Sequence, residues 1–61
     1  MEYRIYVGGN LHSTFEDSVL GYQQAANAFI NLKRRHNKDG MLVTLYGVSG
    51  EIIKDTMDTM I

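Results

Sequence analysis

A long amphipathic segment in the middle of the chain limits what the remaining residues can form. Ser13-Thr14-Phe15-Glu16 is a capping box, in which the Ser13 hydroxyl accepts a hydrogen bond from the Glu16 amide and the Glu16 carboxylate accepts one from the Ser13 amide. Spacings of three and four then predict an apolar stripe on one helix face, formed by Phe15, Val19, Tyr22, Ala26, Phe29 and Ile30. We expect a helix from residue 14 to about residue 36, with a length of about 33 Å.

The segment before this helix predicts a β-strand. Residues 2–7, with the sequence EYRIYV, alternate aromatic and β-branched side chains with polar ones, which is typical of a strand with one buried face. Gly8, Gly9 and Asn10 follow, and these residue types tolerate positive φ angles. We expect the strand to end there.

The segment after the helix, residues 41–57, predicts a β-hairpin. Gly47-Val48-Ser49-Gly50 suits a type I turn followed by a glycine in the left-handed region, which forms a bulge. The expected register pairs Tyr46 with Ile52, Leu45 with Ile53, Thr44 with Lys54, and Met41 with Met57. The spacing of the last apolar residues also fits a helix with Ser49 as its cap: Ile53, Met57, Met60 and Ile61. Both interpretations stay open, with the hairpin favoured by the β-branched residues.

Together these segments predict an α+β fold in a single compact domain, residues 1–61, in the order β-α-β-β. The helix packs on one face of a three-stranded sheet, and its crossover connection is right-handed by the usual rule. The helical interpretation of the last segment gives the alternative order β-α-β-α. With Met1 at its start, we expect a complete small protein.

The small size of the chain predicts association. A protein of 61 residues buries only about 60% of its unfolded surface, so a fold of this size usually needs a disulfide, a metal ion or a partner. The chain contains no cysteine, which excludes disulfides and thiolate metal sites. Self-association, in the simplest case as a homodimer, or docking on a larger protein remains.

One helix covers only one face of the predicted sheet. The residues expected to face the helix are Tyr3, Ile5, Val7, Met41, Val43, Leu45, Ile53 and Met57. The opposite face carries two tyrosines and two aliphatic residues among polar neighbours: Tyr6, Leu42, Tyr46 and Ile52. Apolar patches framed by polar residues, and aromatic residues in particular, are typical of association surfaces. We expect this face to contact another protein or a second copy.

A second helix stripe consists mostly of small residues: Gly21, Ala25, Ala28 and Leu32. Gly21 costs about 1 kcal/mol relative to alanine inside a helix, so its presence needs a reason. One interpretation is close packing of this flank against the sheet. The other is a docking surface for a helix of a second copy or of a partner.

The sequence NLKRRHNKDG, residues 31–40, holds four of the six cationic side chains: Lys33, Arg34, Arg35 and Lys38. Cations at a helix C-terminus complement the helix dipole, and this accounts for most of the run. The alternative is a contact to phosphate or nucleic acid, with Tyr6 and Tyr46 stacking on bases. The net charge of −1 gives no general attraction to nucleic acid or to an anionic membrane.

Residue types that catalyse reactions or bind metals are not grouped in this sequence. His12 and His36 lie at opposite ends of the predicted helix, too far apart to share a metal ion within one chain. Residues 7–14, VGGNLHST, lack the lysine of a phosphate-binding loop and the third glycine of a dinucleotide fingerprint. We therefore predict no metal and no cofactor.

The length and the strand–helix–strand order resemble those of the small tautomerase subunits. That resemblance implies an oligomeric enzyme with an N-terminal proline as its base. Residue 2 here is Glu2 and the chain contains no proline, so the catalytic group of that family is missing. We predict that the protein is not an enzyme.

We expect a non-enzymatic interaction protein. Stand-alone proteins of this size are frequent in phages and mobile elements, where they bind and inhibit or redirect host proteins, and this protein fits that class by size alone. The alternative is a nucleic-acid-binding regulatory protein that uses the basic residues. No apolar stretch reaches the length of about 20 residues that a membrane span needs, and no signal peptide precedes the first strand, so we expect a cytoplasmic location.

Overall fold

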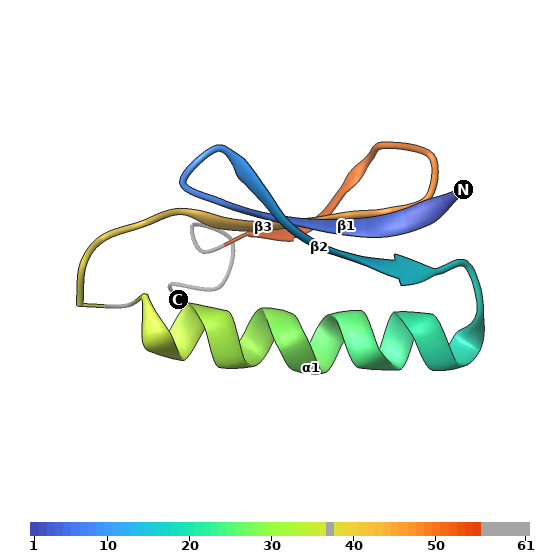
Figure 1. Cartoon of the computed structure of the whole chain (residues 1–61), viewed down its shortest axis with the longest axis horizontal. Coiled ribbons are helices and arrows are strands. Elements are labelled where there is room, and N and C mark those ends of the chain that lie inside the picture. The colour runs from blue at the N-terminus through green and yellow to red at the C-terminus, as the bar shows by residue number, and fades with distance from the viewer. Residues whose placement is uncertain (37, 56–61) are drawn as a thin grey trace.

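A computed structural model of the chain describes residues 1–36 and 38–55. Its elements follow in the order β1 (Glu2–Val7), β2 (Asn10–Glu16), α1 (Val19–Arg35), β3 (Val43–Tyr46) and β4 (Ile52–Asp55). The strands form one antiparallel sheet in the order β2-β1-β3-β4, and α1 lies along one face of it (Figure 1). The predicted α+β class is confirmed, but the described residues contain four strands where we expected three.

The additional strand is β2, whose last residues, 14–16, were predicted to begin the helix. Gly8 and Gly9 have φ angles of 59° and 85°, and a two-residue hairpin turn with positive φ at both central positions joins adjacent antiparallel strands. Strand β1 therefore continues into β2 by a tight reversal, and β2 pairs with β1 along its whole length. The predicted capping box is wrong, because Ser13 lies opposite Ile5 within the sheet.

Helix α1 begins at Val19, five residues later than predicted from residue 14, and ends at Arg35. Its N-cap is Ser18, whose hydroxyl accepts a hydrogen bond of 2.9 Å from the Gly21 amide. At the other end the His36 amide donates to the Leu32 carbonyl at 2.9 Å. At each end of the helix, a backbone group that would otherwise lack a partner therefore makes a hydrogen bond.

The predicted hairpin after the helix is confirmed as far as Asp55. The Gly50 amide donates to the Gly47 carbonyl at 3.0 Å and Gly50 has a φ of 88°, as expected for a type I turn followed by a left-handed glycine. Tyr46 pairs with Ile52 as predicted. The register then shifts by one, so that Leu45 pairs with Lys54 and Thr44 with Asp55. The predicted pairs of Leu45 with Ile53 and of Thr44 with Lys54 are wrong, because Ile53 is the extra residue of a β-bulge.

Two of the sequence-based predictions concern residues at the end of the chain. The predicted pair of Met41 with Met57, and the alternative helix over Met57, Met60 and Ile61, involve residues outside the described part of the chain. In the described residues 52–55 the backbone is a strand, which favours the hairpin interpretation there.

The extra strand changes the path of the chain. The first hairpin reverses the direction before the helix, so β3 pairs with β1 antiparallel instead of parallel. The helical crossover connects β2 to β3, and β1 lies between these two strands. The predicted order β-α-β-β is therefore replaced by β-β-α-β-β in the described residues, because β1 is followed by a turn too short to leave the sheet.

The hydrophobic core lies between α1 and strands β1 and β3. Its buried residues are Ile5, Val7, Ala25, Phe29, Leu32, Val43 and Leu45, with Tyr3, Phe15, Ala28 and Ile53 packed at its margin. The predicted helix-facing residues of β1 and β3 are therefore confirmed within the strands. Met41 is an exception: it precedes β3 and is 39% exposed.

The helix face that packs on the sheet is the small-residue stripe. Gly21, Ala25 and Leu32 are buried, whereas Val19 and Ile30 of the predicted apolar stripe are exposed. A Cβ atom built on Gly21 would lie 1.9 Å from the Glu16 carbonyl oxygen. The first interpretation of this stripe, close packing against the sheet, is the arrangement that the structure contains.

Candidate protein-interaction surface

The sheet face opposite α1, called the outer face here, is formed mainly by alternating side chains of the two central strands. Arg4 lies opposite Tyr46 and Tyr6 lies opposite Thr44 in the register of β1 with β3. Directly paired residues of antiparallel strands point to the same side of the sheet. Since their neighbours Ile5 and Leu45 are buried under the helix, these four side chains face away from it.

The outer face is hollowed. A shallow cavity of about 720 Å³ lies over the central strands, called the outer-face hollow here. Its floor is formed by Glu2, Arg4, Tyr6, Leu42, Thr44 and Tyr46, and its rim by Met1, Gly9 and the turn at residues 47–50. In Figure 1 the β1–β2 and β3–β4 turns both rise on the side away from α1, and residues of both turns line the hollow.

Backbone hydrogen bonds hold both turns in place. The Gly8 amide donates to the Leu42 carbonyl at 2.8 Å, which ties the first turn to the residue before β3. The Gly47 amide donates to the Glu51 carbonyl at 2.7 Å and closes the second turn. The rim of the hollow is therefore built from hydrogen-bonded hairpin turns and is preorganised in this structure.

Two tyrosines meet in the floor of the hollow. The ring centroids of Tyr6 and Tyr46 lie 5.3 Å apart with an interplanar angle of 80°, an edge-to-face arrangement. Both side chains are half-buried. Such a pair contributes about 0.5–1.5 kcal/mol beyond the area it buries, so the rings hold each other in position.

Thr44 lies opposite Tyr6 and two residues before Tyr46 on the same strand, lines the hollow and is only 6% exposed. Within the described residues no side-chain hydrogen bond engages the Thr44 hydroxyl. A group that enters the hollow therefore meets an available donor and acceptor at its base.

The charged residues of the floor neutralise each other. Arg4 Nε donates to Glu2 Oε2 at 3.2 Å, and both side chains are about half exposed. An exposed ion pair of this kind contributes at most about 1 kcal/mol to stability. Its effect on the site is to leave the floor without a net charge.

The predicted patch is largely assembled by the structure. Tyr6, Leu42 and Tyr46 line the hollow together, and Ile52 stands beside Tyr46 with 53% of its surface exposed. Sequence reasoning missed Leu11, which lies opposite Tyr6 on the outer face and is 54% exposed. The helical interpretation of residues 14–36 left residues 10–13 without a strand, although Gly8-Gly9 between two alternating segments is a hairpin signal.

The other predicted interaction surface is occupied within the chain itself. Gly21, Ala25 and Leu32 are buried against the sheet and Ala28 packs at the margin of the core. A partner helix has no access to this flank while the sheet covers it. These four residues are therefore not part of the interaction surface proposed below.

The basic residues lie at the C-terminal end of α1. Arg34, Arg35 and Lys38 are exposed, and Lys33 is half-buried. Since α1 covers the face of the sheet opposite the tyrosines, the two sets of residues that a nucleic-acid site would combine lie on opposite sides of the molecule (Figure 1).

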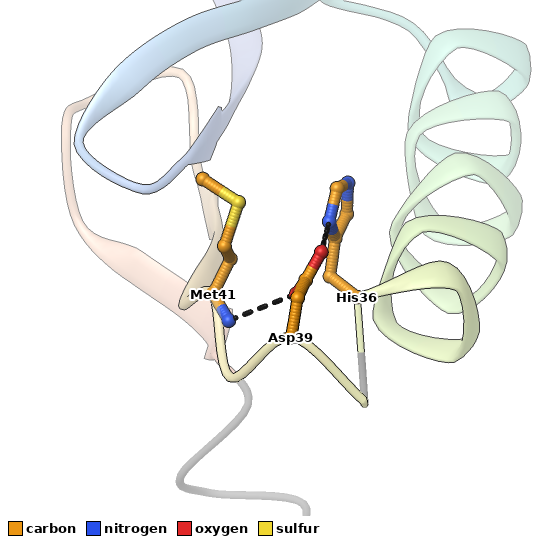
Figure 2. Close-up of polar contacts among 3 residues, drawn as sticks. All are labelled: His36, Asp39 and Met41. Carbon is orange, nitrogen blue, oxygen red and sulfur yellow. Dashed lines mark hydrogen bonds and ion pairs between the residues drawn. The ribbon is translucent and has the colours of Figure 1, made fainter.

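A polar cluster fixes the connection after this basic segment. Asp39 Oδ2 lies 3.0 Å from His36 Nδ1, and Asp39 Oδ1 accepts a hydrogen bond of 3.1 Å from the Met41 amide (Figure 2). The hydrogen bond from His36, followed by that from the Met41 amide, lowers the pKa of the exposed Asp39 carboxyl below its ordinary value. The carboxylate thus links the end of α1 to the approach to β3.

The two histidines serve local contacts. His12 Nδ1 lies 3.1 Å from the Ser13 hydroxyl in β2, and His36 lies beside Asp39. Over residues 1–36 and 38–55, no three side chains of His, Cys, Asp or Glu are grouped so that they could hold a metal ion. In the same residues, no helix has both the length and the apolar character needed to cross a membrane.

Comparison with known proteins does not add a family assignment. No protein-family model, curated protein or solved structure matches this chain.

Proposed function

We propose that this protein is a non-enzymatic interaction module that binds a larger protein through its outer face. The observation that carries the proposal is the outer-face hollow, with its paired tyrosines and hydrogen-bonded rim. Tyrosine is enriched at the energetic centres of protein interfaces, because it buries a large area and orders few rotatable bonds. Because the concave surface is already formed, binding loses less conformational entropy than it would if loops and side chains had to become ordered.

The chemistry of the hollow favours an apolar side chain of the partner as its occupant. Tyr6, Tyr46 and Leu42 supply apolar walls, while Thr44 offers one hydroxyl at the base. Exposed Leu11 and Ile52 extend the apolar surface to both sides of the hollow. A partner that inserts an aromatic or aliphatic residue here would bury the centre of the interface, and the mutual pairing of Glu2 and Arg4 spares it an uncompensated charge in the floor.

The alternative, a nucleic-acid-binding protein, has less support. Binding to phosphates draws on many cations, and the charged floor residues Glu2 and Arg4 pair with each other. The edge-to-face contact of Tyr6 with Tyr46 leaves no parallel pair of rings for successive bases. The exposed cations at the end of α1 would have to act without the tyrosines.

We further propose that the protein comes from a phage or mobile element and that it inhibits or redirects the protein it binds. The support for this is the small size of the chain. The genes beside this one would test the origin, and an activity assay on the captured partner would show the direction of any regulation.

The decisive experiment compares matched tyrosine substitutions. A partner captured from lysate and identified by mass spectrometry is purified, and its affinity for each variant is measured by calorimetry. Tyr46→Asp places a charge in the hollow and should weaken binding about 30-fold or more, the loss expected of a central interface residue. Tyr22→Asp, on the helix side and 39% exposed, is the control and should bind like the wild type.

Two outcomes would contradict the proposal. One is normal binding by Tyr46→Asp with circular dichroism unchanged, together with loss of binding by Tyr22→Asp. The other is oligonucleotide binding that Arg34→Glu with Arg35→Glu abolishes and that falls steeply as salt rises, since that pattern identifies a phosphate-binding surface.

A further inference from the structure

The two edges of the sheet differ in a way that identifies one of them as open. Strands β2 and β4 are the outer strands of the sheet that the described residues form, so within that part of the chain each has one row of backbone amides and carbonyls without a neighbour. The described part of strand β4 has the sequence IIKD, which includes the charged residue types lysine and aspartate. Charged residues in an edge strand are a usual means by which proteins prevent edge pairing.

Strand β2 lacks these protections. It is seven residues long, NLHSTFE, and contains neither proline nor lysine, with no acidic or basic residue before its last position apart from His12. The one irregularity is a bulge at His12, between the pair Ile5–Ser13 and the pair Tyr6–Leu11. The half of the strand from Ser13 to Glu16 is regular, and no other strand of residues 1–36 and 38–55 pairs with its outer edge, which can therefore accept one.

We propose that two copies of this chain pair through β2, antiparallel and about a two-fold axis, so that their sheets join into one. A two-fold axis makes the contact self-complementary and closed, which an edge strand achieves by pairing with its own copy. Because paired residues point to the same face, the axis passes a residue that pairs with its own copy, and we place it at Thr14, opposite Thr14 of the second copy. This contact does not use the outer-face hollow, so the proposed function does not depend on it.

The positions of exposed charges favour a second copy as the occupant of this edge. Gly21, Ala28 and Arg35 are spaced by seven residues, close to two turns, and so lie along one line of α1. Gly21 abuts the Glu16 carbonyl at the end of β2, which places this line on the β2 side of the molecule. Arg35 therefore stands at one end of the β2 side and Asp17 at the other.

An antiparallel pair brings these opposite charges together twice. The two-fold axis places the Asp17 end of each copy beside the Arg35 end of the other. Both side chains are exposed, and within the described residues neither makes an ion pair in its own chain. A parallel arrangement would instead set acidic end against acidic end, which costs energy.

The first test is the mass of the full chain in solution by sedimentation equilibrium over a range of concentrations. We expect a dimer for the wild type. Thr14→Lys introduces two cations close to the axis and should raise the dimer Kd at least about tenfold, since like charges across a strand pair repel. Gln23→Lys adds the same charge at an exposed helix position and should leave the Kd unchanged.

The second test exchanges the charges. Arg35→Glu should weaken the dimer about tenfold at low salt, because two symmetric attractions become repulsions. Asp17→Arg combined with Arg35→Glu restores opposite charges at each contact and should return the Kd toward that of the wild type. High salt should reduce the difference between all of these variants.

Three results would overturn the proposal: a wild-type monomer at every concentration, a dimer that Thr14→Lys leaves intact, or a monomer that takes up only a strand of another protein. The same variants separate this proposal from the proposed function. If the dimer forms through β2 alone, Tyr46→Asp stays dimeric while it loses the larger partner, and Thr14→Lys becomes monomeric while it keeps that partner.

Discussion

Replacing Gly21 with alanine has two opposing effects on stability. Alanine is the better helix former, but its Cβ atom would collide with the backbone of Glu16. In the interior of an exposed helix, alanine is more favourable than glycine by about 1 kcal/mol, so the sequence alone predicts that Gly21→Ala stabilises the protein. In the structure, the added Cβ atom would lie 1.9 Å from the Glu16 carbonyl oxygen and 2.8 Å from its carbonyl carbon. We expect the substitution to destabilise the protein.

The magnitude follows from how far the helix must move. Cβ atoms essentially never approach other atoms within 3.0 Å, so α1 and the end of β2 would have to separate by about 1.1 Å or more. The Glu16 carbonyl cannot simply turn away, because it accepts a hydrogen bond of 2.9 Å from the Ser18 amide. Overpacking of this kind costs about 3 kcal/mol at the upper end of its usual range, against the propensity gain of about 1 kcal/mol.

The expected net loss of about 2 kcal/mol corresponds to a fall in Tm of roughly 8–16 °C for a domain of this size. Thermal unfolding followed by circular dichroism measures it directly. Gln24→Ala, at an exposed position of the same helix, is the matched control and should change stability by less than about 0.5 kcal/mol. A higher Tm for Gly21→Ala would refute the close approach of α1 to β2 and, with it, the assignment of the small-residue stripe to the core.

Three further predictions concern other parts of the fold. Ser18→Ala removes the side-chain acceptor of the Gly21 amide and should cost about 1 kcal/mol, seen as a lower urea midpoint, whereas Ser13→Ala should cost less because Ser13 lies in β2 and not at a helix cap. Phe29→Ala empties the centre of the core, where Phe29 is 1% exposed, and its cost of about 3–5 kcal/mol should leave the chain unfolded by near-ultraviolet circular dichroism at 25 °C. Because the folded-state pKa of Asp39 is lowered, its contribution to stability is present above the unfolded value near 3.8 and is lost as the pH falls through the folded pKa. The wild type should accordingly exceed Asp39→Asn in Tm at pH 6, with the difference closing below pH 3.8, and a difference that persists at low pH would contradict the role of this carboxylate.

The parts of the fold that sequence reasoning predicted correctly are those with a local cause. Alternation in residues 2–7 predicted β1, and the left-handed tolerance of Gly50 predicted the turn between β3 and β4. The pair of Tyr46 with Ile52 followed from that turn, because the length of a hairpin loop sets the register next to it. At the next residue, Ile53, the β-bulge shifts the register, and the remaining predicted pairs no longer hold.

The start of the helix shows why local signals were not sufficient. Ser13 and Ser18 both precede residues that can be helical, and the capping box favoured Ser13. The structure uses Ser18, because residues 10–16 gain a full row of backbone hydrogen bonds by pairing with β1. The glycine pair Gly8 and Gly9 indicated a hairpin turn between β1 and β2. A hairpin and a helix start compete for the same residues, however, and only the pairing with β1 decides between them.

For the candidate site, the sequence by itself determined which residues alternate to the outer face, since the strand period of two follows from backbone geometry. It also determined that the helix is amphipathic and that no disulfide stabilises the fold. Only the tertiary structure decided that Gly21 and Ala25 face the sheet, that β2 forms an open edge, and that Tyr6 meets Tyr46 in a hollow. The physical reason differs between them. Tyr6 and Tyr46 lie on segments that the helix separates in sequence, whereas the β2 edge and the packed face of the helix depend on residues 10–16 pairing with β1 instead of starting the helix. In each case the contact energy arises only when the sheet has formed.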